Sequence, residues 1–406
     1  MQSAPKKKSR VNVRTPEVME RVQAEVANHY KSSIVEKVRN QGGVLTVGDT
    51  TVRLAKQFGF CYGVERAIDL AYASRSVFPE SRIFLIGEII HNPEVNRQLE
   101  EMEIVSLPWR KMDEQYDSLK EDDVVIVPAF GAPISFMDKV ESQGCRIVDT
   151  TCGDVMKVWR RVRNFAKDGI TSIIHGKAGH EETRATASRA EGDDGKGHYL
   201  IVLTLEDVEK VCRYIVNGGD KEEFLSSFEG SYSRGFDPDK HLDHVGVANQ
   251  TTMLKSETEE IQTRVRKAVF ERDGSGENFS VFDTICGATQ ERQDALFDML
   301  KSKMDLLLVV GGYNSSNTTH LVEIGEQELP TFFIRSADCI RSLEEIVHFD
   351  LEEGAEVTSY TEIFKKESSA IIGVTAGASC PNNLIEETIL KVFELRGASV
   401  DDIEAA

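Results

Sequence analysis

The stretch Leu306-Leu-Leu-Val-Val-Gly-Gly-Tyr-Asn-Ser-Ser-Asn-Thr-Thr-His320 carries the pattern that decides the fold of this 406-residue chain. Its apolar run predicts a strand, its two glycines predict a loop, and its polar run opens a helix. The same succession follows apolar runs at 124–127, 172–174 and 371–374. Strands that alternate with helices indicate an α/β fold with mostly parallel sheets. Ligands in such folds lie outside the carboxyl ends of strands, so these loops are where function is sought.

Three similar segments each place a cysteine at the predicted start of a helix. They are Phe58-Gly-Phe-Cys61-Tyr-Gly-Val-Glu, Asp149-Thr-Thr-Cys152-Gly-Asp-Val-Met and Asp283-Thr-Ile-Cys286-Gly-Ala-Thr-Gln. A helix N-terminus favours the thiolate form of cysteine. We therefore expect three similar α/β domains, arranged pseudo-threefold around one common centre.

The chain divides into five predicted parts. They are an amino-terminal arm (1–44), three α/β domains (45–150, 151–284 and 285–385), and a carboxyl-terminal helix and tail (386–406). Residues 1–14 are expected to be disordered. Thr15 then predicts a helix N-cap before Pro16. One apolar stripe, Val18, Val22, Val26, Tyr30, Ile34 and Val38, predicts an amphipathic packing helix that ends at Gly42.

Composition excludes several classes of protein. The formal net charge of −20 argues against a protein whose main task is binding nucleic acid. No apolar run reaches the roughly 18 residues that a membrane span needs, so no membrane role is expected. The basic start lacks the apolar segment of a secretory signal, which makes the cytoplasm the expected location. An odd number of cysteines, seven, in a chain without such a signal argues against a disulfide framework.

The spacing of the cysteines bears on which metal they could hold. None forms a C-x-x-C pair, and a structural zinc site usually takes four ligands in close pairs. Three isolated cysteines fit a cubane iron–sulfur cluster better, with one iron left without a protein thiolate. The alternative for each cysteine is that of a small buried hydrophobe. We expect that second role for Cys145, Cys212 and Cys339, and leave Cys380 open.

Polar loops follow several of the predicted strands. The loop around His180-Glu181-Glu182 could donate to phosphate and relay protons, or could simply be a solvated helix start. The run Asn314-Ser-Ser-Asn317 offers more polar groups than a helix cap requires, which indicates a phosphate cradle. Similar loops contain Ile90-His91-Asn-Pro, Asn249-Gln-Thr251-Thr and Thr375-Ala-Gly-Ala-Ser379.

Together these loops resemble the 4-hydroxy-3-methylbut-2-enyl diphosphate reductase family, whose members complete the methylerythritol phosphate route to isoprenoids. The resemblance runs from about residue 52 to residue 395. It rests on F-C-Y-G-V-E-R-A, I-H-N-P, D-T-T-C-G, A-G-H-E-E-T, N-Q-T-T, D-T-I-C-G-A-T-Q-E-R-Q, N-S-S-N and T-A-G-A-S, in that order. Each motif alone is modest, whereas eight in the right order are specific.

The resemblance implies roles for particular residues. It implies one [4Fe–4S] cluster on Cys61, Cys152 and Cys286, with one iron lacking a protein thiolate. It implies a proton-donating role for Glu182 but not for its neighbour Glu181, and a positioning role for Thr251. The residues implied for diphosphate binding are His91, His180, Ser315, Ser316, Asn317 and Ser379.

One position departs from many bacterial members of the family. They carry a histidine within A-H-G, where this chain reads Ala129-Phe130-Gly131. That loop and the amino-terminal arm resemble the cyanobacterial and plant branch. We assign Phe130 no polar role.

The implied activity is reductive removal of a hydroxyl from an allylic diphosphate, with Glu182 as the proton donor. The resemblance also implies an electron donor such as ferredoxin or flavodoxin, and leaves the oligomeric state open. Two rivals are a cluster-dependent hydro-lyase, which would turn over without reductant, and a non-enzymatic iron–sulfur sensor. A sensor needs no diphosphate cradle, so the polar loops argue against it.

Overall fold

The computed structural model describes residues 10–282, 285–361 and 369–406. These residues fold as two compact units. The double-sheet unit comprises residues 10–12, Phe78–Glu88 and Glu103–Cys286, and the single-sheet unit comprises Val13–Val77, Ile89–Met102 and Gly287–Ala406. Asp283 and Thr284 of the third cysteine motif lie outside the described residues, as do residues 1–9 of the predicted disordered start.

The described strands of the double-sheet unit form two four-stranded sheets in which every pairing is parallel. The first sheet has the order β4-β3-β5-β6 and the second has the order β10-β9-β7-β8. The strands are β3 (Ile83–Ile86), β4 (Ile104–Leu107), β5 (Val124–Val127), β6 (Arg146–Asp149), β7 (Thr171–His175), β8 (Tyr199–Val202), β9 (Val245–Asn249) and β10 (Phe279–Val281). Every residue of β5, β7 and β9 is buried, as expected for parallel strands covered on both faces.

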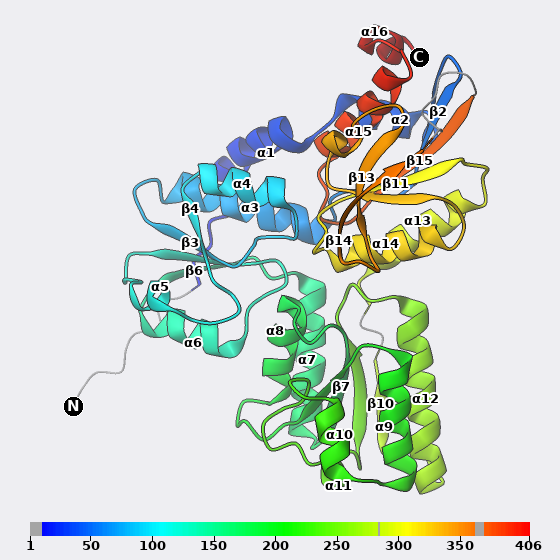
Figure 1. Ribbon diagram of the computed structural model, residues 1–406. Coiled ribbons are helices and arrows are strands. Elements are labelled where there is room, and N and C mark those ends of the chain that lie inside the picture. Colours follow the sequence, from blue (N-terminus) through cyan, green and yellow to red (C-terminus); the bar gives the residue numbers. More distant parts are fainter. Residues whose placement is uncertain (1–9, 283–284, 362–368) are drawn as a thin grey trace. The chain divides into compact units, whose positions relative to one another are not determined.

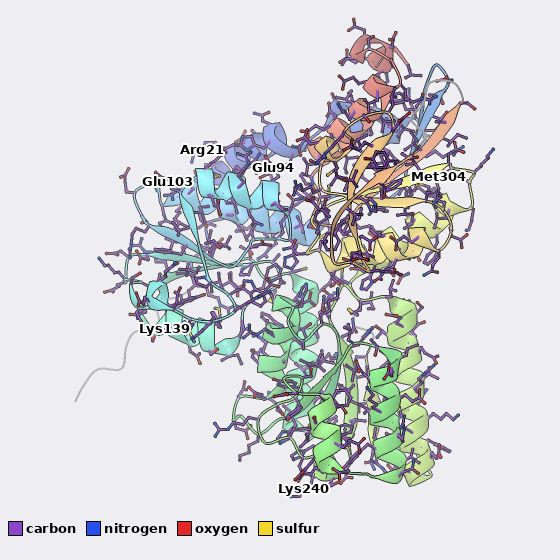
Figure 2. The ribbon with its side chains drawn as sticks, viewed as in Figure 1. Arg21, Glu94, Glu103, Lys139, Lys240 and Met304 are labelled. Carbon is purple, nitrogen blue, oxygen red and sulfur yellow. The ribbon has the colours of Figure 1, made fainter. Side chains whose placement is uncertain are left out.

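Helices cover both faces of the second sheet. The helices of this unit are α5 (Glu114–Asp117), α6 (Ile134–Ser142), α7 (Gly153–Lys167), α8 (Glu181–Ala190), α9 (Leu205–Asn217), α10 (Lys221–Ser227), α11 (Pro238–His241) and α12 (Lys255–Asp273). Helices α9 and α12 lie on one side of this sheet, and α7 and α8 lie on the other (Figure 1). Ile173 on β7 packs in one core with residues of α9 and α12, and the next residue, Ile174, packs in another with α7 and α8. Alternate side chains of a strand point to opposite faces, so β7 joins the two cores. Lys240 on α11 points away from them (Figure 2).

The described strands of the single-sheet unit form one seven-stranded sheet of order β1-β2-β15-β11-β12-β13-β14. The strands are β1 (Val44–Val47), β2 (Thr50–Leu54), β11 (Leu306–Val310), β12 (Thr331–Ile334), β13 (Glu345–Asp350), β14 (Ala355–Tyr360) and β15 (Ala370–Ala376). The four central strands pair in parallel, and antiparallel pairings join the outer strands. The prediction of an α/β fold with mostly parallel sheets is therefore confirmed.

The helices of the single-sheet unit include the amino-terminal arm. They are α1 (Pro16–Tyr30), α2 (Ser33–Asn40), α3 (Tyr62–Val77), α4 (Pro93–Glu101), α13 (Gly287–Leu300), α14 (Ser316–Glu326), α15 (Asn382–Leu395) and α16 (Val400–Ala405), with a 3₁₀ turn at Ala337–Cys339. Helix α1 packs on α3, where the hydroxyl groups of Tyr30 and Tyr72 lie 3.2 Å apart. Within the described ranges, none of the helices combines the length and hydropathy needed to cross a bilayer.

The arm departs from its prediction in two ways. Thr15 caps α1 as predicted, but the apolar stripe is divided between two helices, because the backbone turns extended at Lys31 and Ser32. The hydroxyl of Ser32 accepts from the N–H of Val35 at 2.9 Å and so caps the second helix. The prediction of disorder is wrong for residues 10–14: Val11 donates its N–H to the carbonyl of Ile147 in the double-sheet unit, and Val13 is buried.

Candidate functional site

The three predicted cluster cysteines all lie at helix starts. Cys61 immediately precedes α3, Cys152 is the N-cap residue of α7, and Cys286 immediately precedes α13. All three side chains are half-buried. Each backbone N–H is held by a loop carbonyl, and the N–H to O distances are 3.2 Å from Cys61 to Ala378, 2.7 Å from Cys152 to Ala129 and 3.2 Å from Cys286 to Thr251. The three thiols are thus fixed where the helix dipole stabilises a thiolate.

The remaining cysteines have a different setting. Cys145, Cys339 and Cys380 are buried, and Cys212 is half-buried against the core of the double-sheet unit. Burial raises the pKa of Cys145 and of Cys212 to about 11, and it also raises the pKa of Cys380. A buried thiol that resists ionisation is a poor ligand for iron. The packing roles predicted for Cys145, Cys212 and Cys339 fit this setting, and Cys380 joins them.

Two of the cluster candidates influence the same ammonium group in the double-sheet unit. A hydrogen bond to Asp154 is the main reason that the pKa of Lys157 on α7 is raised. Negative charge on a thiolate at Cys152 or Cys286 acts in the same direction.

The carboxyl ends of β7 and β9 bring an acid and a hydroxyl together in the double-sheet unit. These strands are neighbours in the second sheet, so the loops that follow them meet. His180 follows β7 and caps α8, and its Nδ1 accepts from the N–H of Glu182 at 3.1 Å. The Glu182 carboxylate accepts from the N–H of Thr251 at 2.6 Å and from its hydroxyl at 3.0 Å. The Glu182 side chain is buried, so both bonds form away from bulk water.

Thr251 also connects this acid to a cluster candidate. Its carbonyl accepts from the N–H of Cys286, while its N–H and hydroxyl bind Glu182. Neighbouring Gln250, in the same N-Q-T-T motif, accepts with its Oε1 from the hydroxyl of Thr183 at 2.9 Å and from the N–H of Lys177 at 3.2 Å. The two loops are therefore tied together at several points. Sequence reasoning noted Gln250 only as part of a polar strand end.

Phe130 lies in the loop after β5 and contributes no polar group. It is buried, and its ring meets the imidazole of His180 edge-on with 6.4 Å between ring centroids. Gly131 follows with a φ of +80°, and a Cβ there would lie 2.2 Å from the Trp159 ring. The Phe130 ring thus packs beside His180, one of the residues predicted to bind the diphosphate.

The carboxyl ends of β11 and β15 bring the second set of predicted residues together in the single-sheet unit. These strands are neighbours, so the loops that carry Ser315 and Ser379 meet. The Ser379 hydroxyl is 3.3 Å from that of Ser315 and donates to the carbonyl of His91 at 3.2 Å. The Asn314 amide nitrogen lies 3.4 Å from Nδ1 of His91. The residues predicted for diphosphate binding in this unit are all buried, namely His91, Ser315, Ser316, Asn317 and Ser379.

Asn317 has a buried amide nitrogen that points to a ligand. Its Oδ1 accepts from the N–H of Ala378 at 2.8 Å, which fixes the orientation of the amide. Among the described residues, no group accepts a hydrogen bond from its Nδ2, although Asn317 is only 3% exposed. A buried donor without an acceptor is costly, so a ligand oxygen at this position would stabilise the site.

Two glycines allow the loops of this cradle to approach closely. A Cβ at Gly312 would lie 2.5 Å from the His91 carbonyl oxygen, and one at Gly377 would lie 1.9 Å from the hydroxyl of Thr318. Any larger residue would push these loops apart. The peptide of Ala378 also links cradle and cysteine, because its N–H binds Asn317 and its carbonyl accepts from Cys61.

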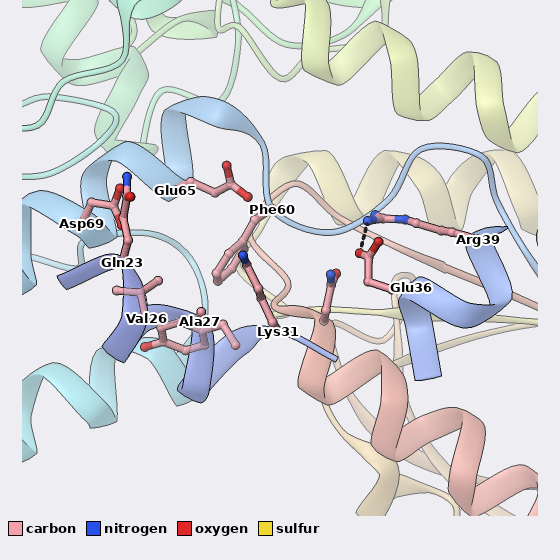
Figure 3. Close-up of a pocket in the computed structure, with 11 residues that line it drawn as sticks. Gln23, Val26, Ala27, Lys31, Glu36, Arg39, Phe60, Glu65 and Asp69 are labelled. Carbon is pink, nitrogen blue, oxygen red and sulfur yellow. Dashed lines mark hydrogen bonds and ion pairs between the residues drawn. The ribbon is translucent and has the colours of Figure 1, made fainter. Parts of the chain in front are cut away.

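A cavity of about 670 Å³ lies beside the Cys61 loop of the single-sheet unit. Its walls come from α1, α2 and the first turns of α3, and include Phe60, Glu65 and Asp69 (Figure 3). Burial raises the pKa of the Glu65 and Asp69 carboxyls. The residue before Cys61 thus borders a partly desolvated, charged cavity formed with the arm.

The fold and these sites define an α/β protein with mostly parallel sheets, whose loops carry half-buried thiols at helix starts, a buried acid–hydroxyl pair and a buried polar cradle. The predicted site residues divide between the units. Those in the double-sheet unit are Cys152, His180, Glu182, Thr251 and Cys286, and those in the single-sheet unit are Cys61, His91, Ser315, Ser316, Asn317 and Ser379. The chain belongs to the LytB protein family, which matches residues 52–393.

Sequence relatives and solved structures agree with this family. The chain is 47% identical over 375 residues to a 4-hydroxy-3-methylbut-2-enyl diphosphate reductase from Gloeothece citriformis, covering 91% of both chains. It is 46% identical to the reductase of the same name from Microcystis aeruginosa, covering 94% of both chains. A solved reductase from Plasmodium falciparum shares the fold, with a TM-score of 0.61 and 22% identity over 83% of this chain and 86% of that one. The resemblance to the cyanobacterial branch is thereby confirmed.

Proposed function

We propose that this chain is an iron–sulfur reductase that converts 4-hydroxy-3-methylbut-2-enyl diphosphate to isopentenyl and dimethylallyl diphosphate. Its family and the names of its relatives support the activity. The observation that carries the proposal is the hydrogen-bonded series from Glu182 through Thr251 to Cys286. One threonine joins a buried acid to a candidate cluster ligand, as a reaction that needs both protons and electrons requires.

We propose Cys61, Cys152 and Cys286 as ligands of one [4Fe–4S] cluster. The donor chemistry fits, since these are half-buried thiols at helix starts. Three thiolates leave one iron of a cubane without a protein ligand. When bound, such a cluster supplies electrons and a Lewis-acidic iron for the substrate hydroxyl.

The polar loops would bind the diphosphate. Asn317 would donate through the Nδ2 that has no acceptor among the described residues, with Ser315, Ser316 and Ser379 beside it. The start of α14, which carries the positive end of the helix dipole, adds positive potential. We assign His91 and His180 to the same ligand. Hydrogen bonds to a charged group contribute about 1.5–3 kcal/mol each, so a few such bonds suffice for firm binding.

Glu182 would supply the proton for the leaving hydroxyl. After the proton has left, the carboxylate still accepts from both the N–H and the hydroxyl of Thr251, and these bonds stabilise the ionised form that remains. Thr251 would thus orient the acid and favour proton delivery. Overall, the substrate C–O bond breaks, two electrons and two protons are taken up, and water leaves. A positioned general acid contributes a factor of about 10²–10⁴ in rate.

The activity is tested by incubating anaerobically reconstituted protein with the diphosphate substrate, with and without a reductant such as dithionite. A reductase forms isopentenyl and dimethylallyl diphosphate only with the reductant, and consumes two electrons for each product. Turnover without reductant would indicate a hydro-lyase and overturn the proposal. Binding without turnover under either condition would indicate a sensor and also overturn it.

The finer features of the biology remain parts of the same proposal. We expect a small ferredoxin or flavodoxin as electron donor, and a location in the bacterial cytoplasm. No role in binding nucleic acid is proposed. The five domain boundaries given above stay predictions. The oligomeric state stays open.

A further inference from the structure

Arg292 is a buried arginine that donates hydrogen bonds to the loop that precedes Cys61. It lies on α13, is 3% exposed, and follows Cys286 by six residues. Its Nη2 donates to the carbonyl of Gly59 at 2.6 Å and to that of Phe60 at 3.2 Å. Its Nε donates to Gly59 at 3.2 Å, and its Nη1 to the carbonyl of Ala288 at 2.9 Å. One guanidinium therefore joins the helix that begins beside Cys286 to the two peptides that lead into Cys61.

The loop that precedes Cys61 also packs closely on its other side, against the start of α15. Gly59 has a φ of +73°, and a Cβ there would lie 2.9 Å from Oδ1 of Asn382 and 3.3 Å from the carbonyl of Cys380. The N–H of Cys61 donates to Ala378. The loop thus has little freedom to move toward α15, and Arg292 closes the side toward α13. A ligand sulfur needs this kind of fixed backbone to keep its geometry when a cluster changes charge.

The charge of Arg292 also matters, because it is buried beside the peptide of a proposed ligand. Taking a guanidinium out of water is costly unless its donors are satisfied. Here at least three main-chain carbonyls satisfy them. Burial raises the pKa of the Glu65 carboxyl, and the positive charge of Arg292 acts against this by lowering it. A fixed cation beside a cluster ligand favours the reduced, more negative state of the cluster.

We propose that Arg292 is a positioning residue for the iron–sulfur centre, which it serves in two separable ways. Its planar fork of donors bonds the Gly59 and Phe60 carbonyls and fixes the backbone before Cys61, whereas the three donors of a lysine ammonium share one nitrogen and rotate freely. Its charge raises the reduction potential of the centre. The inference rests on the proposed cluster, and assigns to this arginine a role in tuning it rather than in contacting substrate.

Three substitutions separate the two contributions. Arg292→Lys keeps the charge and loses the fork, Arg292→Gln keeps one amide donor and loses the charge, and Arg292→Met loses both. The matched control is Arg189→Met on α8, because Arg189 is also a buried arginine, 5% exposed, and donates to a main-chain carbonyl, that of Ala185, at 2.7 Å. Each full-length variant is reconstituted anaerobically. Iron and sulfide per chain, the electron paramagnetic resonance spectrum of the reduced form, and the midpoint potential by redox titration are then measured.

We expect Arg292→Gln and Arg292→Met to shift the midpoint potential to more negative values and to alter the spectrum. Arg292→Lys should keep nearly the wild-type potential but bind less cluster, and Arg189→Met should keep both potential and spectrum. A wild-type potential and spectrum in Arg292→Gln or Arg292→Met would overturn the inference and leave the proposed function intact. If Arg292→Lys shifted the midpoint potential as far as Arg292→Gln does, the charge of Arg292 would not be what sets the potential. A wild-type chain that takes up no cluster would overturn the proposed function, and the inference with it.

Discussion

Thr251 donates both its backbone N–H and its side-chain hydroxyl to the carboxylate of Glu182, at 2.6 and 3.0 Å. The two residues are 69 positions apart and meet because β7 and β9 are adjacent parallel strands. A buried carboxylate held by two donors from a single residue has one fixed orientation. The Glu182 carboxylate is therefore a buried acid of defined orientation.

Glu182→Gln should abolish most turnover while keeping the cluster. The substitution preserves shape but removes the proton that Glu182 is proposed to deliver, and a positioned general acid contributes a factor of about 10²–10⁴ in rate. Product formation under reducing conditions measures the first effect, and iron and sulfide per chain measure the second.

Glu181→Gln is the matched control for that experiment. Glu181 is the neighbouring residue and the first of α8, whereas the two donors of Thr251 bind Glu182. We expect this variant to keep most of its turnover. If Glu182→Gln turned over at the wild-type rate, Glu182 would have no part in the mechanism.

Asn317→Asp should weaken binding of the diphosphate by about ten- to a hundredfold. A hydrogen bond to a charged group contributes about 1.5–3 kcal/mol, and each change of about 1.4 kcal/mol alters the dissociation constant tenfold. The new carboxylate keeps the acceptor that the N–H of Ala378 uses, but replaces the donor Nδ2 with an anionic oxygen. Titration calorimetry with the substrate and oxidised holoprotein measures the change. Asn217→Asp, at an exposed position on α9, is the control for added charge. Equal affinities for the wild type and Asn317→Asp would reject the assignment.

Serine substitutions should divide the cysteines into two groups. Cys61→Ser, Cys152→Ser and Cys286→Ser should each lose most of the iron and sulfide after anaerobic reconstitution, because each removes one of the three proposed thiolate ligands. Cys145→Ser and Cys212→Ser should retain the cluster, because burial raises the pKa of both thiols to about 11. Full cluster content in any member of the first group would remove that cysteine from the ligand set.

The stacked pair His198 and His241 should make the double-sheet unit less stable in mild acid. Their ring centroids lie 3.6 Å apart, and burial lowers the pKa of both. The Nδ1 of His198 lies 2.9 Å from the hydroxyl of Ser233, and the Nδ1 of His241 accepts from the N–H of Asp237. Charges around the pair act in both directions: Asp237 and Asp243 raise the pKa of His241, and Lys240 and Lys221 lower it.

The sign of the effect follows from those lowered pKa values. The unfolded chain takes up protons near pH 6.5, before the folded pair does, so stability is full above that pH and is lost as the pH falls toward the folded pKa values. Thermal unfolding followed between pH 7 and pH 5 should show the melting temperature falling. His241→Phe should reduce that slope, and a slope equal to the wild-type one would show that the pair does not carry it.

Local features of the fold were predictable from the sequence. The apolar run Leu306–Val310 is β11, because buried strands show as apolar runs. Cys61, Cys152 and Cys286 all lie at helix starts, as the similarity of their three segments predicts. Pairings between distant strands were not predictable. The pairing of β2 with β15 joins residues more than 300 positions apart, and no local pattern records it.

The arm shows where a periodic pattern misleads. The apolar stripe runs on past Tyr30, so spacing alone predicts one helix, yet Ser32 caps a new one. The signal was present, because serine is a favoured N-cap residue, but it was outweighed by the continuing stripe. Residues 10–14 misled in a different way. Their polar composition predicts disorder, whereas the backbone bond from Val11 and the burial of Val13 depend on contacts that composition does not reveal.

The sequence motifs identified which residues belong to the candidate site, but they did not identify the hydrogen-bond partners of those residues. Glu182, Thr251 and Asn317 were chosen from polar loops, and the structure shows what each one binds. Arg292 stood in the quoted T-Q-E-R stretch, but only its hydrogen bonds to Gly59 and Phe60 distinguish it from an ordinary helix arginine. A side chain that acts on a distant backbone leaves no spacing pattern in the sequence.

The most direct test of the account is the electron paramagnetic resonance spectrum of the reduced, anaerobically reconstituted protein, recorded with and without the allylic diphosphate. Three thiolate ligands and one accessible iron predict the signal of a reduced [4Fe–4S] cluster that changes when the substrate is added. A protein without an iron–sulfur signal, or one whose signal stays the same at saturating substrate, would contradict the account.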